Sequence, residues 1–135
     1  ENGQATNILD SSVKFTKDQI SNITIRHIES GTINIGGELV CDNIALTTNE
    51  IIHNWQACVI EELTEQDLEP LFVSEPELVL LGTGSQLIFP PRELFFALAR
   101  RGIGLEAMDT AAACRTFNIL ASEGRRVAAV LIVKN

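Results

Sequence analysis

Cys114 is a first candidate for chemistry, because its thiol lies near the start of a predicted helix. The stretch LEAMDTAAACRTFNILASEG predicts a helix from Thr110 to Glu123, with Asp109 or Thr110 as its N-cap and Gly124 as its stop. A helix N-terminus favours the thiolate, which would make the cysteine reactive. Cys114, however, lies about one turn inside the helix and on its apolar side, where burial favours the neutral thiol. The sequence therefore predicts a buried, unreactive packing residue.

The turn Gly82-Thr83-Gly84 is a second candidate, because a glycine-rich loop between a strand and a helix can hold a phosphate. Its sequence departs from the common phosphate-binding patterns. No Gly-Lys-Ser or Gly-Lys-Thr follows, and Leu87 stands at the third glycine position of the dinucleotide pattern. The next predicted helix begins near Pro91, too late for its free amides to point at the turn. Backbone freedom is therefore the main predicted role of these glycines.

Arg115 and Asn118 are the polar candidates within the helix that carries Cys114. Arg115 falls on the outer side of the helix, where solvent or a partner would meet it. Asn118 is a weak helix former in a mid-helix position, so we expect its amide to hydrogen-bond a loop or a neighbouring chain. The sequence has no close histidine–carboxylate pair and no metal-ligand cluster. It therefore predicts no catalytic residue, no metal site and no cofactor.

Three short apolar runs and two helices must position these candidates. The runs cover residues 77–82, 103–108 and 125–133, and they alternate with helices from Pro91 to Arg101 and from Thr110 to Glu123. This βαβαβ order predicts parallel strands with right-handed crossovers, covered on both faces.

The first half of the chain predicts a different kind of sheet. From Ile23 to Trp55, short alternations of apolar and polar residues predict a meander of antiparallel strands, with a hairpin turn at Ser30-Gly31. Together the two halves predict an α/β domain with an added antiparallel layer. We expect one globular domain over residues 20–135 and a polar, disordered tail over residues 1–19.

An acidic stretch joins the two halves. From Glu61 to Glu75 the chain has six carboxylates and no lysine or arginine. Thr64 is a predicted N-cap for a short helix between Leu63 and Val73, which Pro70 is predicted to end or kink. The main interpretation is a solvated connecting segment, and the alternative is a docking site for a basic partner.

Charge and composition exclude several classes of function. The net charge is −8, with 13 acidic against 3 basic residues in residues 1–75. A surface so acidic repels phosphate backbones, so nucleic acid is not an expected partner. The apolar run from Val127 to Val133 is far shorter than the roughly 20 residues of a membrane-spanning helix. Three widely spaced cysteines, an odd number, fit reduced thiols in a cytoplasmic protein rather than a disulfide framework.

Each predicted helix carries an apolar residue opposite its buried stripe. In the first helix Leu94, Phe95 and Leu98 form the stripe, and Phe96 lies opposite. In the second helix Ile119 lies opposite the stripe that contains Cys114. Two such residues on neighbouring helices predict a second contact surface, for a protein partner or for a second copy in a homodimer.

The stretches LVLLGTGSQ and ARRGIGLEAMDTAAACRTFNILASEGRRVAAVLI resemble a family of small proteins of largely unknown function. The family includes bacterial members, an archaeal structural-genomics representative, the adipogenesis-associated human protein and a mitochondrial assembly factor for respiratory complex I. The resemblance is specific over residues 76–133, looser over residues 20–75 and absent from residues 1–19. It implies a three-layer α/β fold with a mixed central sheet and an assembly or interaction role, and it supplies no catalytic residues.

The leading functional hypothesis is thus a soluble, non-enzymatic interaction protein that resembles an assembly factor for a respiratory or membrane complex. Its partner would be a protein such as a membrane-complex subunit. The chain would bind it in the cytoplasm or at the periphery of the inner membrane. The alternative is a small-molecule or nucleotide-binding protein that uses the Gly82 to Gly84 turn and the Asp109-Thr110 helix start. The residues that would surround such a ligand are Gly82, Thr83, Gly84, Asp109, Thr110, Arg115 and Asn118.

Overall fold

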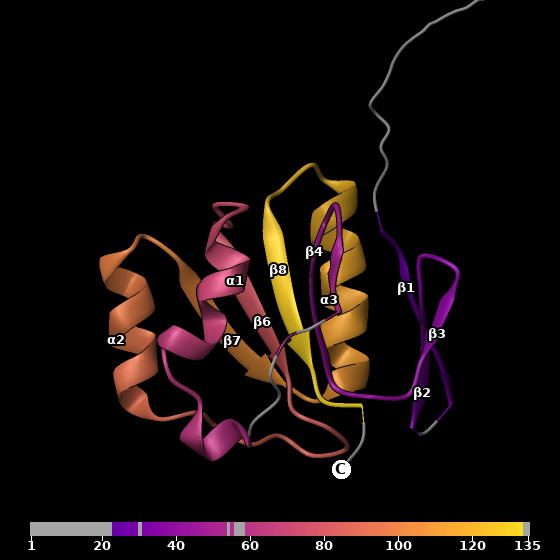
Figure 1. Cartoon of the computed structure of the whole chain (residues 1–135), viewed down its shortest axis with the longest axis horizontal. Helices are drawn as coiled ribbons and strands as arrows, with labels where there is room; N and C mark the ends of the chain where they lie inside the picture. The colour runs from indigo at the N-terminus through magenta and orange to yellow at the C-terminus, as the bar shows by residue number, and fades with distance from the viewer. Residues whose placement is uncertain (1–22, 30, 54, 56–58, 134–135) are drawn as a thin grey trace, which may run out of the picture.

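The computed structural model describes residues 23–29, 31–53, 55 and 59–133 (Figure 1). The predicted tail over residues 1–19 lies outside this part, as do Ser30 of the predicted hairpin turn and Cys58. The strands are β1 (Ile25–Glu29), β2 (Thr32–Ile35), β3 (Glu38–Val40), β4 (Ile44–Thr47), β5 (Ile51–Ile52), β6 (Leu78–Gly82), β7 (Gly104–Met108) and β8 (Val127–Leu131). The helices are the 3-10 turns η2 (Ile60–Glu62) and η3 (Gln66–Leu68) and the α-helices α1 (Glu69–Phe72), α2 (Arg92–Arg100) and α3 (Thr110–Ser122).

A mixed five-stranded sheet forms the centre of the fold, in the order β5-β4-β8-β6-β7. β6 pairs in parallel with both β7 and β8, so that Leu80 is paired with Glu106 on one side and with Ala129 on the other. β4 pairs antiparallel with β8, and β5 pairs antiparallel with β4. The predicted parallel βαβαβ half and the mixed central sheet are therefore confirmed.

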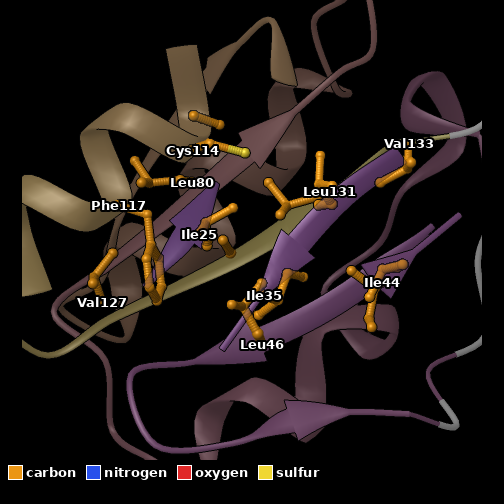
Figure 2. Packing of buried hydrophobic residues seen from close by; sticks show 14 of the residues in the cluster. Ile25, Ile35, Ile44, Leu46, Leu80, Cys114, Phe117, Val127, Leu131 and Val133 are labelled. Carbon is orange, nitrogen blue, oxygen red and sulfur yellow. The ribbon is translucent and has the colours of Figure 1, made fainter. Parts of the chain in front are cut away.

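The central sheet has a hydrophobic core on each face, which gives the fold its three layers. Figure 1 shows α2 and α3 on opposite sides of the sheet, and Figure 2 shows the core on the α3 side. Successive residues of β8 face opposite sides of the sheet, as the pleat of a strand requires. Val127, Ala129 and Leu131 belong to the cluster on the α3 side. Ala128 and Val130 belong to the cluster that includes residues of α1 and α2. Because both sides of β8 are covered, all five of its residues are buried and apolar.

The N-terminal half is divided between two sheets. β1, β2 and β3 form a separate antiparallel sheet, whose residues Ile25, Ile33 and Ile35 pack into the α3 cluster. The predicted antiparallel layer is confirmed for these strands. The hairpin of β4 and β5 instead extends the central sheet, where β4 pairs with β8 although 80 residues or more separate them in the sequence.

β7 differs from the prediction that all three apolar runs are covered on both faces. Gly104 and Glu106 are exposed, and the other residues of β7 are half-buried. The reason is its position, because β7 is the last strand in the sheet order and, among the described strands, pairs with β6 alone.

The acidic segment from Glu61 to Glu75 is folded against the sheet rather than a plain connection. Leu63, Leu68 and Leu71 are fully buried in the α2-side core, while the six carboxylates are exposed or half-buried. Pro70 neither ends nor kinks a helix. It lies in the first turn of α1, where the missing N–H of proline has no helical partner to lose.

The predicted N-cap and stop residues of the two long helices are confirmed, although α2 is one residue shorter than predicted at each end and α3 is one residue shorter at its C-terminal end. Asp109 is the N-cap of α3, and its Oδ1 accepts a hydrogen bond of 2.8 Å from the Ala112 N–H. Gly102 and Gly124 follow α2 and α3 with φ of 77° and 79°, the left-handed conformation that glycine adopts at helix C-termini.

Candidate functional site

The Gly82-Thr83-Gly84 turn lies at the carboxyl end of β6, beside the start of α3. The Gly84 N–H donates to Thr110 Oγ1 at 2.8 Å, and the Thr110 hydroxyl donates to the Ile132 carbonyl at 2.7 Å. The Thr83 N–H donates to the Met108 carbonyl at 2.8 Å. These backbone amides, which would hold a phosphate in the alternative hypothesis, are already used inside the protein. A small-molecule site here stays a prediction, and such a ligand would have to replace these bonds.

Gly82 is needed for close approach rather than for a turn. A Cβ at this position would lie 3.0 Å from Leu131 Cδ2, 3.1 Å from Ala113 Cβ and 3.1 Å from Thr110 Cα. The last contact is with the backbone of α3, which cannot move aside as a side chain can. The glycine therefore allows α3 to start directly against the end of β6.

Asn118 joins α3 to the N-terminal sheet through both ends of its amide. Its Oδ1 accepts the Ile25 N–H at 2.8 Å, and its Nδ2 donates to the Ile25 carbonyl at 2.6 Å. The sequence predicted a hydrogen bond to a loop or a neighbouring chain, whereas the amide bonds the strand β1 of the same chain. Arg115, five residues after the first residue of α3, is exposed on the outer side as predicted. The geometry gives Asn118 a structural role.

Cys114 is a packing residue of the α3-side core (Figure 2). Its side chain is 2% exposed, among Leu80, Phe117 and Leu131. Burial raises the pKa of the Cys114 thiol to about 11, although the charge of Arg115 acts in the opposite direction. The thiol is therefore neutral near pH 7, and the predicted unreactive cysteine agrees with this environment.

Phe96 and Ile119 are exposed, but they lie on two different surfaces. Phe96 is 57% exposed on α2 and Ile119 is 58% exposed on α3. The prediction that their helices are neighbours is wrong, because α2 and α3 cover opposite faces of the central sheet. The chain moves from β6 to β7 and then back past β6 to β8. Since parallel crossovers are right-handed as a rule, this reversal puts the two helices on opposite faces.

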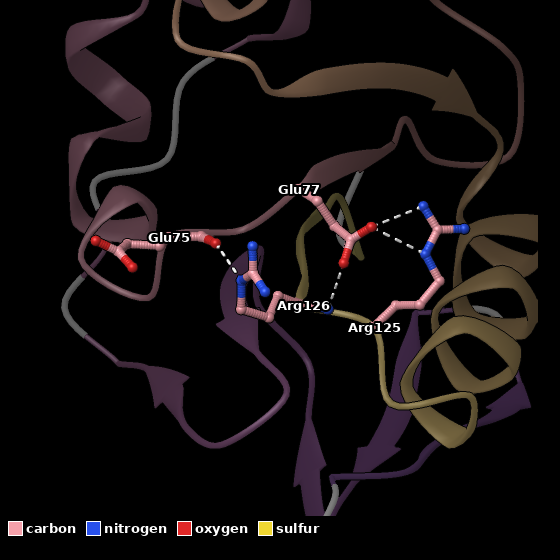
Figure 3. A network of polar contacts seen from close by, with 4 residues as sticks. All are labelled: Glu75, Glu77, Arg125 and Arg126. Carbon is pink, nitrogen blue, oxygen red and sulfur yellow. Dashed lines mark hydrogen bonds and ion pairs between the residues drawn. The ribbon is translucent and has the colours of Figure 1, made fainter.

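Two polar features could not be predicted from the sequence, because each combines residues far apart in the chain. The first joins the starts of β6 and β8 (Figure 3). Arg125 donates to Glu77 Oε1 from Nη2 at 2.9 Å and from Nε at 3.1 Å, and Arg126 Nε donates to the Glu75 carbonyl at 2.8 Å. The hydrogen bond from Arg125, with that from the Arg126 N–H, lowers the pKa of Glu77 below its usual range.

The second feature is a groove of about 360 Å³ between the acidic segment and α2. Its lining consists of Glu62, Leu63, Thr64, Glu65, Pro91, Glu93, Leu94, Ala97 and Arg100. The acidic stretch was the signal present in the sequence, but nothing in it indicated that α2 lies alongside.

Within residues 23–29, 31–53, 55 and 59–133 there is no group of three or more histidine, cysteine, aspartate or glutamate side chains placed to hold a metal ion. No helix in this part of the chain combines the length and the apolar character that crossing a bilayer requires.

Known proteins resemble the chain in sequence. NADH dehydrogenase (ubiquinone) 1 alpha subcomplex assembly factor 3 of Homo sapiens is 34% identical over 100 residues, which are 73% of this chain and 54% of that protein. The 13 kDa major membrane protein of Francisella tularensis is 32% identical over 73 residues, which are 54% of this chain and 59% of that protein. The chain therefore spans a little over half the length of these curated relatives.

The fold itself also occurs in solved structures. A crystal structure of a Bordetella parapertussis protein matches with a TM-score of 0.78 and 30% identity, over 86% of this chain and 99% of that one. The family model described as a protein of unknown function (DUF498/DUF598) matches residues 25–132, which include every strand and helix described above. The chain therefore belongs to the DUF498/DUF598 family of proteins of unknown function.

Proposed function

We propose that this chain is a non-enzymatic interaction protein that assists the assembly of a membrane-associated protein complex. The observation that carries the proposal is the similarity, over 73% of the chain, to assembly factor 3 of the NADH dehydrogenase (ubiquinone) 1 alpha subcomplex. Under this proposal the partner is a protein subunit, and the chain reaches the membrane periphery through that subunit.

The surface of the chain supports this role. Phe96 and Ile119 expose more than half of their side chains, each on the outer side of a helix whose other side is buried in a core. Single exposed apolar side chains are common on protein surfaces, and these two mark the outer sides of α2 and α3 as the surfaces to test for partner binding. Since the two residues lie on opposite faces, each serves as the control for the other.

A pull-down from the native organism tests the proposal, with the tagged wild type, Phe96→Ala and Ile119→Ala. The wild type should recover subunits of a membrane complex, and one variant should lose them while the other keeps them. Both variants should keep the wild-type melting temperature, because neither residue is buried. Failure of the wild type to recover any membrane-complex subunit, over several growth conditions and mild detergents, would contradict the proposal.

Light scattering separates a partner from a second copy. If Phe96 lies in a homodimer interface, the wild type has twice the mass of Phe96→Ala. If it contacts a different protein, the two masses are equal.

A further inference from the structure

The groove beside α2 combines an apolar floor with an acidic rim. Leu63, Leu94 and Ala97 line it and are at most 7% exposed, so they form its floor. Glu62 and Glu93 line it and are exposed, so they stand at its rim. A ligand in this groove would therefore meet an apolar surface and carboxylates together.

The rim carboxylates are not neutralised by neighbouring arginines. Among the described residues, Glu62 and Glu93 take part in no ion pair, whereas Glu65 pairs with Arg101. Arg101 is further fixed by Phe72, whose ring centroid lies 4.2 Å from the guanidinium carbon. Arg101 is therefore engaged by Glu65 and Phe72. Arg100 is the one cationic residue among those that line the groove.

The surroundings of the groove strengthen its negative potential. Residues 61–75 carry six carboxylates and no lysine or arginine, and residues 62–65 of this segment form one wall. The positive end of the α2 dipole, near Pro91, acts against this potential, but Glu93 in the first turn offsets it. A groove of this charge attracts cationic partners and repels anionic ones such as nucleic acid or an acidic lipid surface.

We propose that this groove binds a basic segment of a partner protein, in which lysine or arginine residues flank an apolar side chain. The apolar side chain lies on Leu94 and Ala97, and the cationic groups reach Glu62 and Glu93. The exposed ring of Phe96, three residues after Glu93 on α2, provides a further surface for a cation. This inference rests on the proposed function, because it names the surface and the partner chemistry that the assembly role uses.

The first test titrates the isotope-labelled full chain with a short synthetic peptide that has lysines on both sides of one leucine. The NMR chemical shifts of the backbone amides should change at residues 62–65 and 93–100. A peptide with glutamates in place of its lysines should cause no such changes. Serine in place of the leucine should weaken binding, because the floor is apolar. Shift changes spread over other acidic surfaces, with none concentrated in the groove, would overturn the inference.

Charge-reversal variants give the matched control. The double variant Glu62→Lys, Glu93→Lys should bind the lysine peptide with about tenfold lower affinity, because it loses two favourable contacts of moderate strength. Glu61→Lys with Glu69→Lys changes the net charge equally, but neither residue lines the groove. This control pair should lose clearly less affinity than the groove pair, because it changes the surrounding potential and no groove contact, and an equal loss in both pairs would show attraction by general charge only. Circular dichroism melting shows that each variant is folded before it is titrated.

The pull-down distinguishes this inference from the assembly role. If the Glu62→Lys and Glu93→Lys variant recovers membrane-complex subunits as well as the wild type does, the groove proposal is wrong and the assembly role stands. If the wild type recovers none, the assembly role is wrong, and the peptide titration alone decides whether the groove binds basic segments.

Discussion

Cys114 is the residue at which chemistry and packing make opposite predictions. Its buried side chain and raised pKa predict that a maleimide labels it far more slowly in native buffer than in denaturant. The exposed Cys41 is an internal reference that should label quickly in both conditions, in a background where Cys58 is replaced by serine. Mass spectrometry of digested samples reads each site separately, and rapid native labelling of Cys114 would contradict the packing role.

The same residue allows a stability prediction. Cys114→Ala removes only the sulfur atom and leaves a small cavity, so it should lower the free energy of unfolding by about 1 kcal/mol. Cys114→Arg places an unpaired charge among Leu80, Phe117 and Leu131 and should prevent a stable fold. Urea denaturation measures the first change, and expression in soluble form reports the second.

Gly82 predicts a loss of stability from one added methyl group. Gly82→Ala brings its Cβ to 3.1 Å from the backbone of Thr110, so α3 must shift, at a cost of about 1–3 kcal/mol. Gly104→Ala is the matched control, because its new Cβ would lie 3.1 Å from Leu78 Cδ1, the end of a side chain that can turn away. In urea, Gly82→Ala should have a clearly lower free energy of unfolding than Gly104→Ala. Equal free energies would contradict this account.

At the scale of elements, Asn118 holds the small sheet against α3. Asn118→Ala leaves the Ile25 N–H and carbonyl without their partner, at a cost of about 1–3 kcal/mol. Amide hydrogen exchange should become faster in β1 and β2 and stay slow in β6 and β8, which do not depend on this contact. Uniform acceleration over both sheets would show instead that the two sheets unfold together.

The pair of Glu77 and Arg125 joins the starts of β6 and β8 and predicts a pH dependence. Because the folded pKa of Glu77 is lowered, its contribution to stability is present above the pKa of an unfolded glutamate. That contribution is lost as the pH falls through the lower, folded value. Glu77→Gln should therefore be less stable than the wild type at neutral pH and approach it in acid. A constant difference from neutral to acid pH in urea unfolding would contradict the assignment.

At the scale of the whole molecule, the sequence predicted which residues form strands and helices better than it predicted which of these elements lie side by side. The run VAAVL of β8 is apolar throughout because both faces of a central strand are covered, so its burial was readable. The strand IALT of β4 carries no signal that its partner is β8, because hydrogen bonds of the backbone do not depend on side-chain type. Strand order, and with it the side on which each helix lies, therefore required the structure.

The candidate site shows the same division. Asp109 as an N-cap and Cys114 on a buried stripe follow from local sequence, because capping and helix periodicity act over one or two turns. The groove does not, because its walls come from residues 62–65 and from α2, about thirty positions later. The hydrogen bond that the Gly84 N–H donates in the Gly82-Thr83-Gly84 turn likewise depends on Thr110, which lies 26 residues away.

The central position of β8 has a consequence for synthesis on the ribosome. β4 and β6 are not neighbours in the sheet; each pairs with β8, which follows both of them in the chain. Until residues 127–131 have left the exit tunnel, β8 is not available to pair with β4 and β6. The nascent chain then exposes the edge of each of these two apolar strands that β8 will cover. Since translation proceeds at roughly 5–20 residues per second, those edges stay open for seconds, within reach of chaperones and of other nascent chains.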